Sequence, residues 1–110
     1  VKKVTEINPA MTGAPIFIPA GTYEGMDEDI PTMGVYTQML TRKDMPEEVV
    51  YHVLKGIMEN VDHIVKVHSI GRFIQMESAG TMATVPYHPG AAKYFEEQGI
   101  QIPDHVKPVD

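Results

Sequence analysis

The sequence of 110 residues contains no cysteine, and only nine of its residues are lysine or arginine. Without cysteine, a disulfide framework and thiolate chemistry are excluded, although this does not decide the compartment. The basic residues are scattered and the net charge is −6, whereas binding to nucleic acid or to an anionic membrane surface needs clustered positive charge. We therefore expect neither of these partners.

Long hydrophobic runs are also missing. No run of apolar residues approaches the roughly 18 that are typical of a transmembrane helix, so the sequence predicts no such helix. The chain begins at Val1 and has no basic-then-apolar signal segment, so we expect a processed protein or an excised piece of a longer one. Its length corresponds to one domain or part of one, and an apolar content of 43% suffices for a small core.

Short catalytic motifs are absent as well. There is no glycine-rich phosphate loop, no G-x-S-x-G elbow, and no H-E-x-x-H pattern at His52. His63 and His68 are five residues apart, which does not place them on one face of a helix. Ser69 and Ser78 lack a recognisable base partner. We expect the histidines to be surface or capping residues, with no catalytic residue, metal site or cofactor.

Residues 44–68 form the one long segment with strong helical periodicity. Its apolar residues recur at intervals of three and four, on one side of a helix: Val49, Val50, Val53, Leu54, Ile57, Met58, Val61, Ile64 and Val65. Asp44 could cap the first N–H groups, Pro46 suits the first turn, and Glu47 completes a capping-box spacing. The pattern predicts one amphipathic scaffold helix about 33 Å long, lying across another layer.

Two strands and an acidic loop are predicted before this helix. Residues 14–20 are an apolar run typical of a buried strand, and residues 32–41 are rich in β-branched and aromatic residues. Residues 21–31 between them contain two glycines and four acidic residues, as expected for a loop. The acidic spacing does not match a calcium loop, so a solvated loop is the favoured interpretation.

The remaining segments give weaker signals. Residues 1–12 are expected to be a strand or loop, residues 69–80 a short helix, and residues 81–85 a short strand or extended connection. Residues 88–99 predict a second helix with a proline in the first turn and a glycine stop. Residues 100–110 contain two prolines and are expected to form a loosely packed tail.

Four short motifs follow one another along the chain. They are Gly21, Thr22, Tyr23 and Gly25; Pro31 and Thr32; Val50, Tyr51 and Lys55; and Pro86, His88, Pro89, Gly90, Ala91 and Tyr94. In order and spacing they resemble the C-terminal third or so of TAXI-family solute receptors, the extracytoplasmic binding proteins of TRAP transporters. Glu24 and Met26 stand where that family usually has Pro and Gln. If the family's Gln helps to order the turn or reaches the ligand, a different ligand or weaker binding is expected here.

The resemblance implies an α/β fold. It would be a partial type II periplasmic-binding-protein-like lobe, with a short β-sheet packed by one long and one or two shorter helices. Residues 1–110 would then be a single domain or fragment from the C-terminal part of a two-lobed protein. Residues 1–31 would supply a second-lobe strand and loop, residues 32–43 the strand returning through the hinge, and residues 44–110 first-lobe helices and tail. The elements expected from periodicity agree with an α/β plan.

The same resemblance places the loop of residues 22–32 nearest the hinge. Thr22, Tyr23 and Thr32 are the candidate ligand or hinge contacts, and Gly21 and Gly25 would allow close backbone approach. The alternative is that Tyr23 packs the turn and both threonines only satisfy backbone groups.

The implied function is that of a periplasmic receptor. The family's substrates are small organic acids, such as glutamate-like or dicarboxylate anions, delivered to membrane permease subunits without catalysis. Arg42 and Arg72 have no evident convergent site, so the main anion-binding groups are expected outside this chain.

Two other functions remain open. One is a stand-alone interaction module that forms a homodimer through unpaired strand edges and exposed apolar helix faces, without small-molecule binding. The other, more remote, is a hydrolase using His88 with acidic partners, although His88 is better interpreted as a helix cap.

Overall fold

The computed structural model describes residues 2–7, 16–32, 34 and 36–110. The chain divides into two compact units, an N-terminal unit of residues 1–38 and a C-terminal unit of residues 39–110. The described residues form a small mixed α/β structure with one two-stranded sheet, which agrees with part of an α/β lobe.

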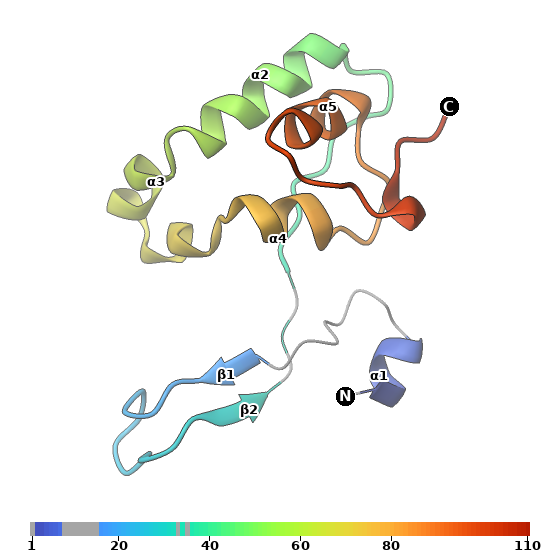
Figure 1. Cartoon of the computed structure of the whole chain (residues 1–110). Helices are drawn as coiled ribbons and strands as arrows, with labels where there is room; N and C mark the ends of the chain where they lie inside the picture. The colour runs from blue at the N-terminus through green and yellow to red at the C-terminus, as the bar shows by residue number, and fades with distance from the viewer. Residues whose placement is uncertain (1, 8–15, 33, 35) are drawn as a thin grey trace. The chain divides into compact units, whose positions relative to one another are not determined.

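The N-terminal unit contains a short helix and a β-hairpin (Figure 1). Helix α1 spans Lys2–Ile7, strand β1 spans Ile16–Ile18 and strand β2 spans Ile30–Thr32. The strands are antiparallel, with the Cα pairs Ile16–Thr32, Phe17–Pro31 and Ile18–Ile30. In this unit, none of the residues whose burial is described (3, 6, 7, 17–32, 34 and 36–38) is buried.

Three predictions for this unit are wrong. Of the described residues in segment 1–12, residues 2–7 are helical, where a strand or loop was predicted. The second strand was expected at residues 32–41, but β2 (residues 30–32) overlaps that range only at Thr32, and residues 36–41 form no regular element. Pairing with β1 across the hairpin fixes where β2 lies, and local composition does not reveal pairing. Residues 14, 15, 33 and 35 lie outside the described residues.

The third wrong prediction is the burial of the first strand. The Phe17 side chain is 51% exposed, although an apolar run bounded by glycines is typical of a buried strand. Burial requires a covering layer, and none of residues 17–32 of the hairpin is buried against one. The apolar run therefore predicted the strand correctly but not its exposure.

The C-terminal unit begins with two helices, α2 (Glu47–Met58) and α3 (Val61–Val67), where one continuous helix was predicted. The break falls at Asn60, whose φ of −124° and ψ of 27° are not helical. Its side-chain Nδ2 donates to the Gly56 carbonyl oxygen at 2.8 Å, a bond that competes with the helical ladder. Glycine and asparagine are also poor helix formers, so the ladder breaks where both occur within one turn.

Asp44 does not cap α2, which corrects a second feature of that prediction. Pro46 occupies the N-cap position, and no side chain bonds the first N–H groups. The Asp44 carboxylate instead accepts from Nε and Nη2 of Arg42, at 2.8 and 2.5 Å. A bidentate, charge-assisted pair with a neighbouring guanidinium is the stronger bond, so the carboxylate is not available as a cap.

After α3 the chain turns back through a 3₁₀ helix, η1 (Ser69–Phe73), and α4 (Met76–Thr81). One short helix was predicted here, but Ile74 and Gln75 are extended and divide it in two. Residues 82–85 contain no strand and Thr81 belongs to α4, so the short strand that was one of the two alternatives for residues 81–85 is wrong.

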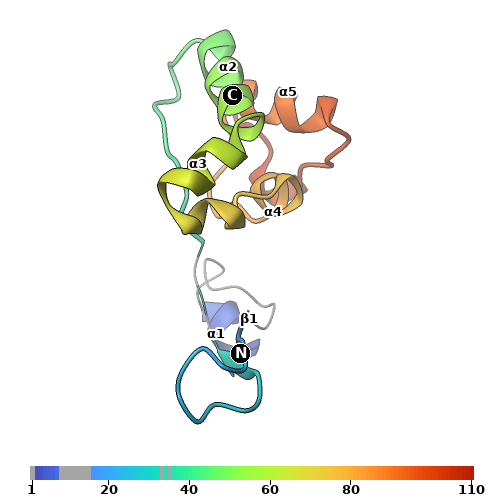
Figure 2. The same cartoon turned by 90° about the vertical axis from the view of Figure 1, so that its left-hand side faces the viewer.

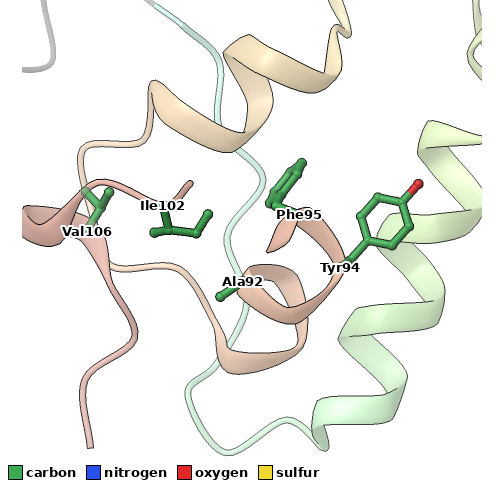
Figure 3. Packing of buried hydrophobic residues seen from close by; sticks show 5 residues of the cluster. All are labelled: Ala92, Tyr94, Phe95, Ile102 and Val106. Carbon is green, nitrogen blue, oxygen red and sulfur yellow. The ribbon is translucent and has the colours of Figure 1, made fainter. Parts of the chain in front are cut away.

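Helix α5 (Pro89–Glu97) lies beside α2 and reaches α4 (Figures 1 and 2). It confirms the predicted second helix, with Pro89 in the first turn and Gly99 at a φ of +82° after its end. It also supplies most of the core of the C-terminal unit: Ala92, Tyr94, Phe95, Ile102 and Val106 (Figure 3). Phe95 points toward α4, and the Tyr94 and Tyr51 ring centroids are 5.7 Å apart.

The C-terminal segment is packed, so the prediction of a loose tail is wrong. Ile102 and Val106 are 5% and 1% exposed, and a 3₁₀ helix, η2, spans Asp104–Val106. The Tyr87 N–H donates to the Val106 carbonyl at 2.8 Å, and the Tyr87 hydroxyl donates to the Ala79 carbonyl at 2.6 Å. Burial raises the pKa of this phenol. Ile102 and Val106, which lie on either side of Pro103, are too few to form a periodic pattern, so only tertiary packing reveals their burial.

The contact between α2 and α5 is unusually close at Gly90. A Cβ atom at this position would overlap the Glu47 carbonyl oxygen and lie 3.0 Å from the Tyr51 backbone nitrogen. His88 bonds both helix starts: its Nδ1 accepts from the Gly90 N–H at 3.2 Å, and its Nε2 lies 3.0 Å from the Met45 carbonyl oxygen. Because Nδ1 is an acceptor, Nε2 carries the proton and donates to Met45.

Polar side chains complete this contact along the rest of α5. The Tyr51 hydroxyl donates to Glu97 Oε2 at 2.6 Å, and this hydrogen bond raises the pKa of Tyr51. Lys93 pairs with Glu47 at 3.5 Å, and both side chains are half exposed. Exposed ion pairs add little stability, so the backbone approach at Gly90 is the main constraint.

Substitution of Gly90 tests this constraint against a matched glycine. We expect Gly90→Ala to lower the free energy of unfolding by about 3 kcal/mol, since the added methyl meets backbone rather than a movable side chain. Gly56 lies in α2, and an added Cβ atom there would have nothing within 4 Å. Gly56→Ala should therefore raise the free energy of unfolding by about 0.5–1 kcal/mol. Urea denaturation of both variants measures this, and equal effects would contradict the account.

A valine pair tests the packed C-terminal segment. Val106→Ala should lower the free energy of unfolding by about 2 kcal/mol, because two buried methyl groups are lost and a cavity remains. Val109 is 60% exposed, so Val109→Ala should change the free energy of unfolding by less than about 0.5 kcal/mol. Thermal unfolding followed by circular dichroism compares them, and a silent Val106→Ala would mean that the segment is detached.

Candidate ligand-binding site

The loop of residues 19–29, between β1 and β2, holds most of the predicted site residues. Two glycines determine the backbone conformation of this loop. Gly21 and Gly25 have φ values of +77° and +81°, in the left-handed region that residues with a side chain disfavour. The Gly21 N–H donates to the Met26 carbonyl at 2.7 Å, which closes the turn between the two glycines. Both glycines are therefore required by the turn itself.

Two side chains hold this loop to its own backbone. The Thr22 hydroxyl donates to the Pro19 carbonyl at 2.6 Å, and Asp29 Oδ1 accepts from the Ala20 N–H at 2.8 Å. The second bond spans nine residues and joins the two ends of the loop. The loop is thus ordered by hydrogen bonds between its own residues.

The structure brings four of the five predicted site residues together. Gly21, Thr22, Tyr23 and Gly25 share the turn, and the Tyr23 side chain is 67% exposed. Thr32 lies at the opposite end of the hairpin, because the pair nearest the loop is Ile18–Ile30 and Thr32 is two residues further along β2. One small ligand at the turn would contact Tyr23 before it reached Thr32.

The charge of the loop is strongly negative. Glu24, Asp27 and Glu28 are exposed beside Asp29, and no described basic side chain pairs with them. A carboxylate ligand placed among these groups would be repelled, since like charges at short range disfavour binding. The loop itself therefore cannot supply the counter-charge for an anion.

Arg42 and Arg72, the two arginines considered as anion-binding groups, each contact a neighbouring side chain. Arg42 is paired with Asp44, and the Arg72 guanidinium stacks over the Phe73 ring at 4.9 Å from its centroid. Both belong to the C-terminal unit. Neither joins a cluster of anion-binding groups among the described residues.

Two hollows occur in the C-terminal unit. An open depression of about 740 Å³ lies between the end of α5 and residues 99–107, and its one cation, Lys107, is paired with Asp104. A groove of about 220 Å³ lies between residues 39–45 and α2, lined mainly by apolar side chains such as Met39, Leu40 and Val53. Neither hollow is lined by a predicted site residue.

No three His, Asp or Glu side chains in the described part of the chain lie close enough together to hold a metal ion. No helix among these residues is long and apolar enough to cross a membrane.

The hairpin and the helical unit belong to a class of binding proteins. The model of the NMT1-like family matches residues 1–99, almost the whole chain, and the protein is a member of this family. Members of the NMT1-like family are binding proteins rather than enzymes, and the family includes periplasmic solute-binding proteins. A small molecule is therefore the general kind of ligand.

Sequence reasoning missed Asp29 as the residue that closes the loop. It counted Asp29 only as one of four acids, and the nine-residue separation from Ala20 matches no local turn pattern. The one available signal was an aspartate directly before a β-branched residue, which is too common to be specific.

Removal of Asp29 tests how the loop is ordered. Asp29→Ala should cost about 0.5–2 kcal/mol of local stability, as for other carboxylate-to-backbone bonds, and should lower the exchange protection of the Ala20 amide. Asp27→Ala removes a neighbouring carboxylate that makes no such bond and should leave the amide unchanged. Hydrogen exchange by NMR distinguishes them, and equal loss of protection in both would refute this role.

Proposed function

We propose that the protein is the solute-binding component of a TRAP-type transporter, that it works outside the cytoplasm, and that it delivers a small organic acid to membrane permease subunits. The observation that carries this proposal is the NMT1-like match over residues 1–99, which gives the class of binding protein. The order of the four short motifs supports the finer TAXI-like assignment and the glutamate-like or dicarboxylate ligand.

The proposed architecture assigns separate tasks to segments of the chain. Residues 1–31 contribute the strand and loop of one lobe, residues 32–43 the return through the hinge, and residues 44–110 the helices of the other lobe. A two-lobed receptor binds its ligand between lobes, where a few polar groups fix orientation. The exposed, hydrogen-bonded turn of residues 21–25 suits a position at the rim of such a cleft.

The proposed site residues are Gly21, Thr22, Tyr23, Gly25 and Thr32, as ligand or hinge contacts. Because the loop carries four carboxylates, its contribution is to the uncharged part of the ligand. Tyr23 can pack its ring against a carbon chain and offer its hydroxyl, and the backbone can approach closely at the glycines. The ligand's carboxylates would be held by positive groups that this loop lacks.

Calorimetric titration tests both the ligand class and the loop. Because the main anion-binding groups are expected outside these residues, we expect glutamate or a C4 dicarboxylate to bind this chain only weakly and a neutral sugar not at all. Tyr23→Ala should weaken the binding of the acid further, about tenfold, or about 1.4 kcal/mol. Phe73→Ala, at an aromatic residue of the C-terminal unit that is 62% exposed, is the matched control and should bind as the unmodified protein does. Binding of the sugar instead of the acids would contradict the ligand class, and an unaffected Tyr23→Ala would contradict the site.

A further inference from the structure

His88 is held by two hydrogen bonds that only its neutral ring can make together. Its Nδ1 accepts from the Gly90 N–H at 3.2 Å, and its Nε2 lies 3.0 Å from the Met45 carbonyl oxygen, to which it donates. A protonated imidazole carries hydrogen on both nitrogens, so its Nδ1 can no longer accept. One added proton therefore places two donors against each other at Gly90.

The surroundings of this bond also disfavour the protonated ring. Gly90 is buried where the backbones of α2 and α5 touch, so water has little access to its N–H, and a buried donor without a partner costs free energy. Helix α5 begins at this point, and a positive charge at the N-terminus of a helix meets the positive end of the helix dipole. Both effects act in the same direction.

The charged and titratable side chains on the segments that meet here are mostly engaged with one another. The pairs are Arg42 with Asp44, Glu47 with Lys93, Tyr51 with Glu97, and Lys43 with the Asp110 carbonyl oxygen. Glu48 is exposed and lies about 100° round α2 from Glu47, which pairs with α5. Glu96 lies about two turns along α5, near Lys107. The described carboxylates on these segments are thus paired or directed away from the ring.

We propose that His88 is an acid-sensitive latch, which holds the start of α5 against the chain before α2 at neutral pH and releases it when the ring is protonated. The unfolded chain takes up this proton without losing a hydrogen bond. It therefore binds more protons than the folded chain does in the range where histidine titrates, about pH 7.5 to 5.5. The free energy of unfolding then falls as the pH falls through this range.

Release of the latch has a local consequence beyond stability. The bond from His88 Nε2 holds the backbone of Met45, and Met45 lines the apolar groove between residues 39–45 and α2. When the protonated ring leaves Gly90, it also leaves Met45, so one wall of this groove is loosened together with the first turn of α5. The latch does not depend on the proposed solute-binding function.

His68 supplies a matched control for the first test. Its Nδ1 accepts from the Ile70 N–H, also at 3.2 Å, but His68 is exposed and Ile70 is 61% exposed, so water can replace this bond. Among the described residues, the His68 ring has no second hydrogen bond. His88→Asn and His68→Asn each replace the ring with a side chain that can still cap a helix and does not titrate.

Urea denaturation at pH 7.5 and at pH 5.5 compares the two variants with the unmodified chain. Between these pH values we expect the folding equilibrium constant to fall about tenfold in the unmodified chain and in His68→Asn, because the bond to a buried donor is lost. In His88→Asn it should fall less than about twofold, since no proton can break the cap. An equal fall in His88→Asn and the unmodified chain, or no fall in the unmodified chain, would overturn the proposal.

NMR of the unmodified chain provides a second test, which holds even if His88→Asn does not fold. At pH 7.5 the ¹⁵N shifts of the His88 ring should show a proton on Nε2 and none on Nδ1. As the ring takes up its second proton, the exchange protection factor of the Gly90 amide should fall about tenfold. The Ile100 amide, which bonds the Phe95 carbonyl at the other end of α5, should keep its protection. Unchanged protection of Gly90 while the ring titrates would overturn the proposal.

Discussion

The close approach of α5 to α2 is the constraint on which the C-terminal unit depends. At Gly90 the two backbones are in direct contact, and His88 bonds the starts of both helices through its two ring nitrogens. This contact places the buried face of α5 where Tyr94 meets Tyr51 and Phe95 meets the segment around α4. Residues 100–106 then close the core from the other side, through Ile102 and Val106.

This arrangement gives the His-Pro-Gly-Ala sequence at residues 88–91 a physical meaning. The histidine caps α5 and bonds the chain before α2, the proline starts the helix, and the glycine allows the helices to touch. The motif at residues 88–91, which is part of the family resemblance, is thus a packing device. The resemblance to a receptor family therefore rests partly on residues that maintain the fold.

The sequence predicted what depends on local chemistry and missed what depends on tertiary pairing. The α5 helix, its histidine cap and its glycine stop were all correct, because each is set by residues within one or two turns. The break at Asn60 was missed because the apolar period continues across it. The position of β2 and the burial of Val106 were missed because both are decided by segments distant in sequence.

The candidate site could be predicted only in part, for a related reason. Glycines at residues 21 and 25 indicated a turn, and the structure has one there, with Tyr23 exposed beside them. The pairing register that places Thr32 at the far end of the hairpin, and the Asp29 bond that closes the loop, have no local signature. None of residues 17–32 of the hairpin is buried, so binding at this loop requires surfaces that these residues do not supply.

The central claim is that the protein is a solute receptor working outside the cytoplasm. Immunoblotting of fractionated source cells, with an antibody against this chain, tests it most directly. The account predicts that the protein is found in the extracytoplasmic fraction. Recovery only from the cytoplasmic fraction would contradict it.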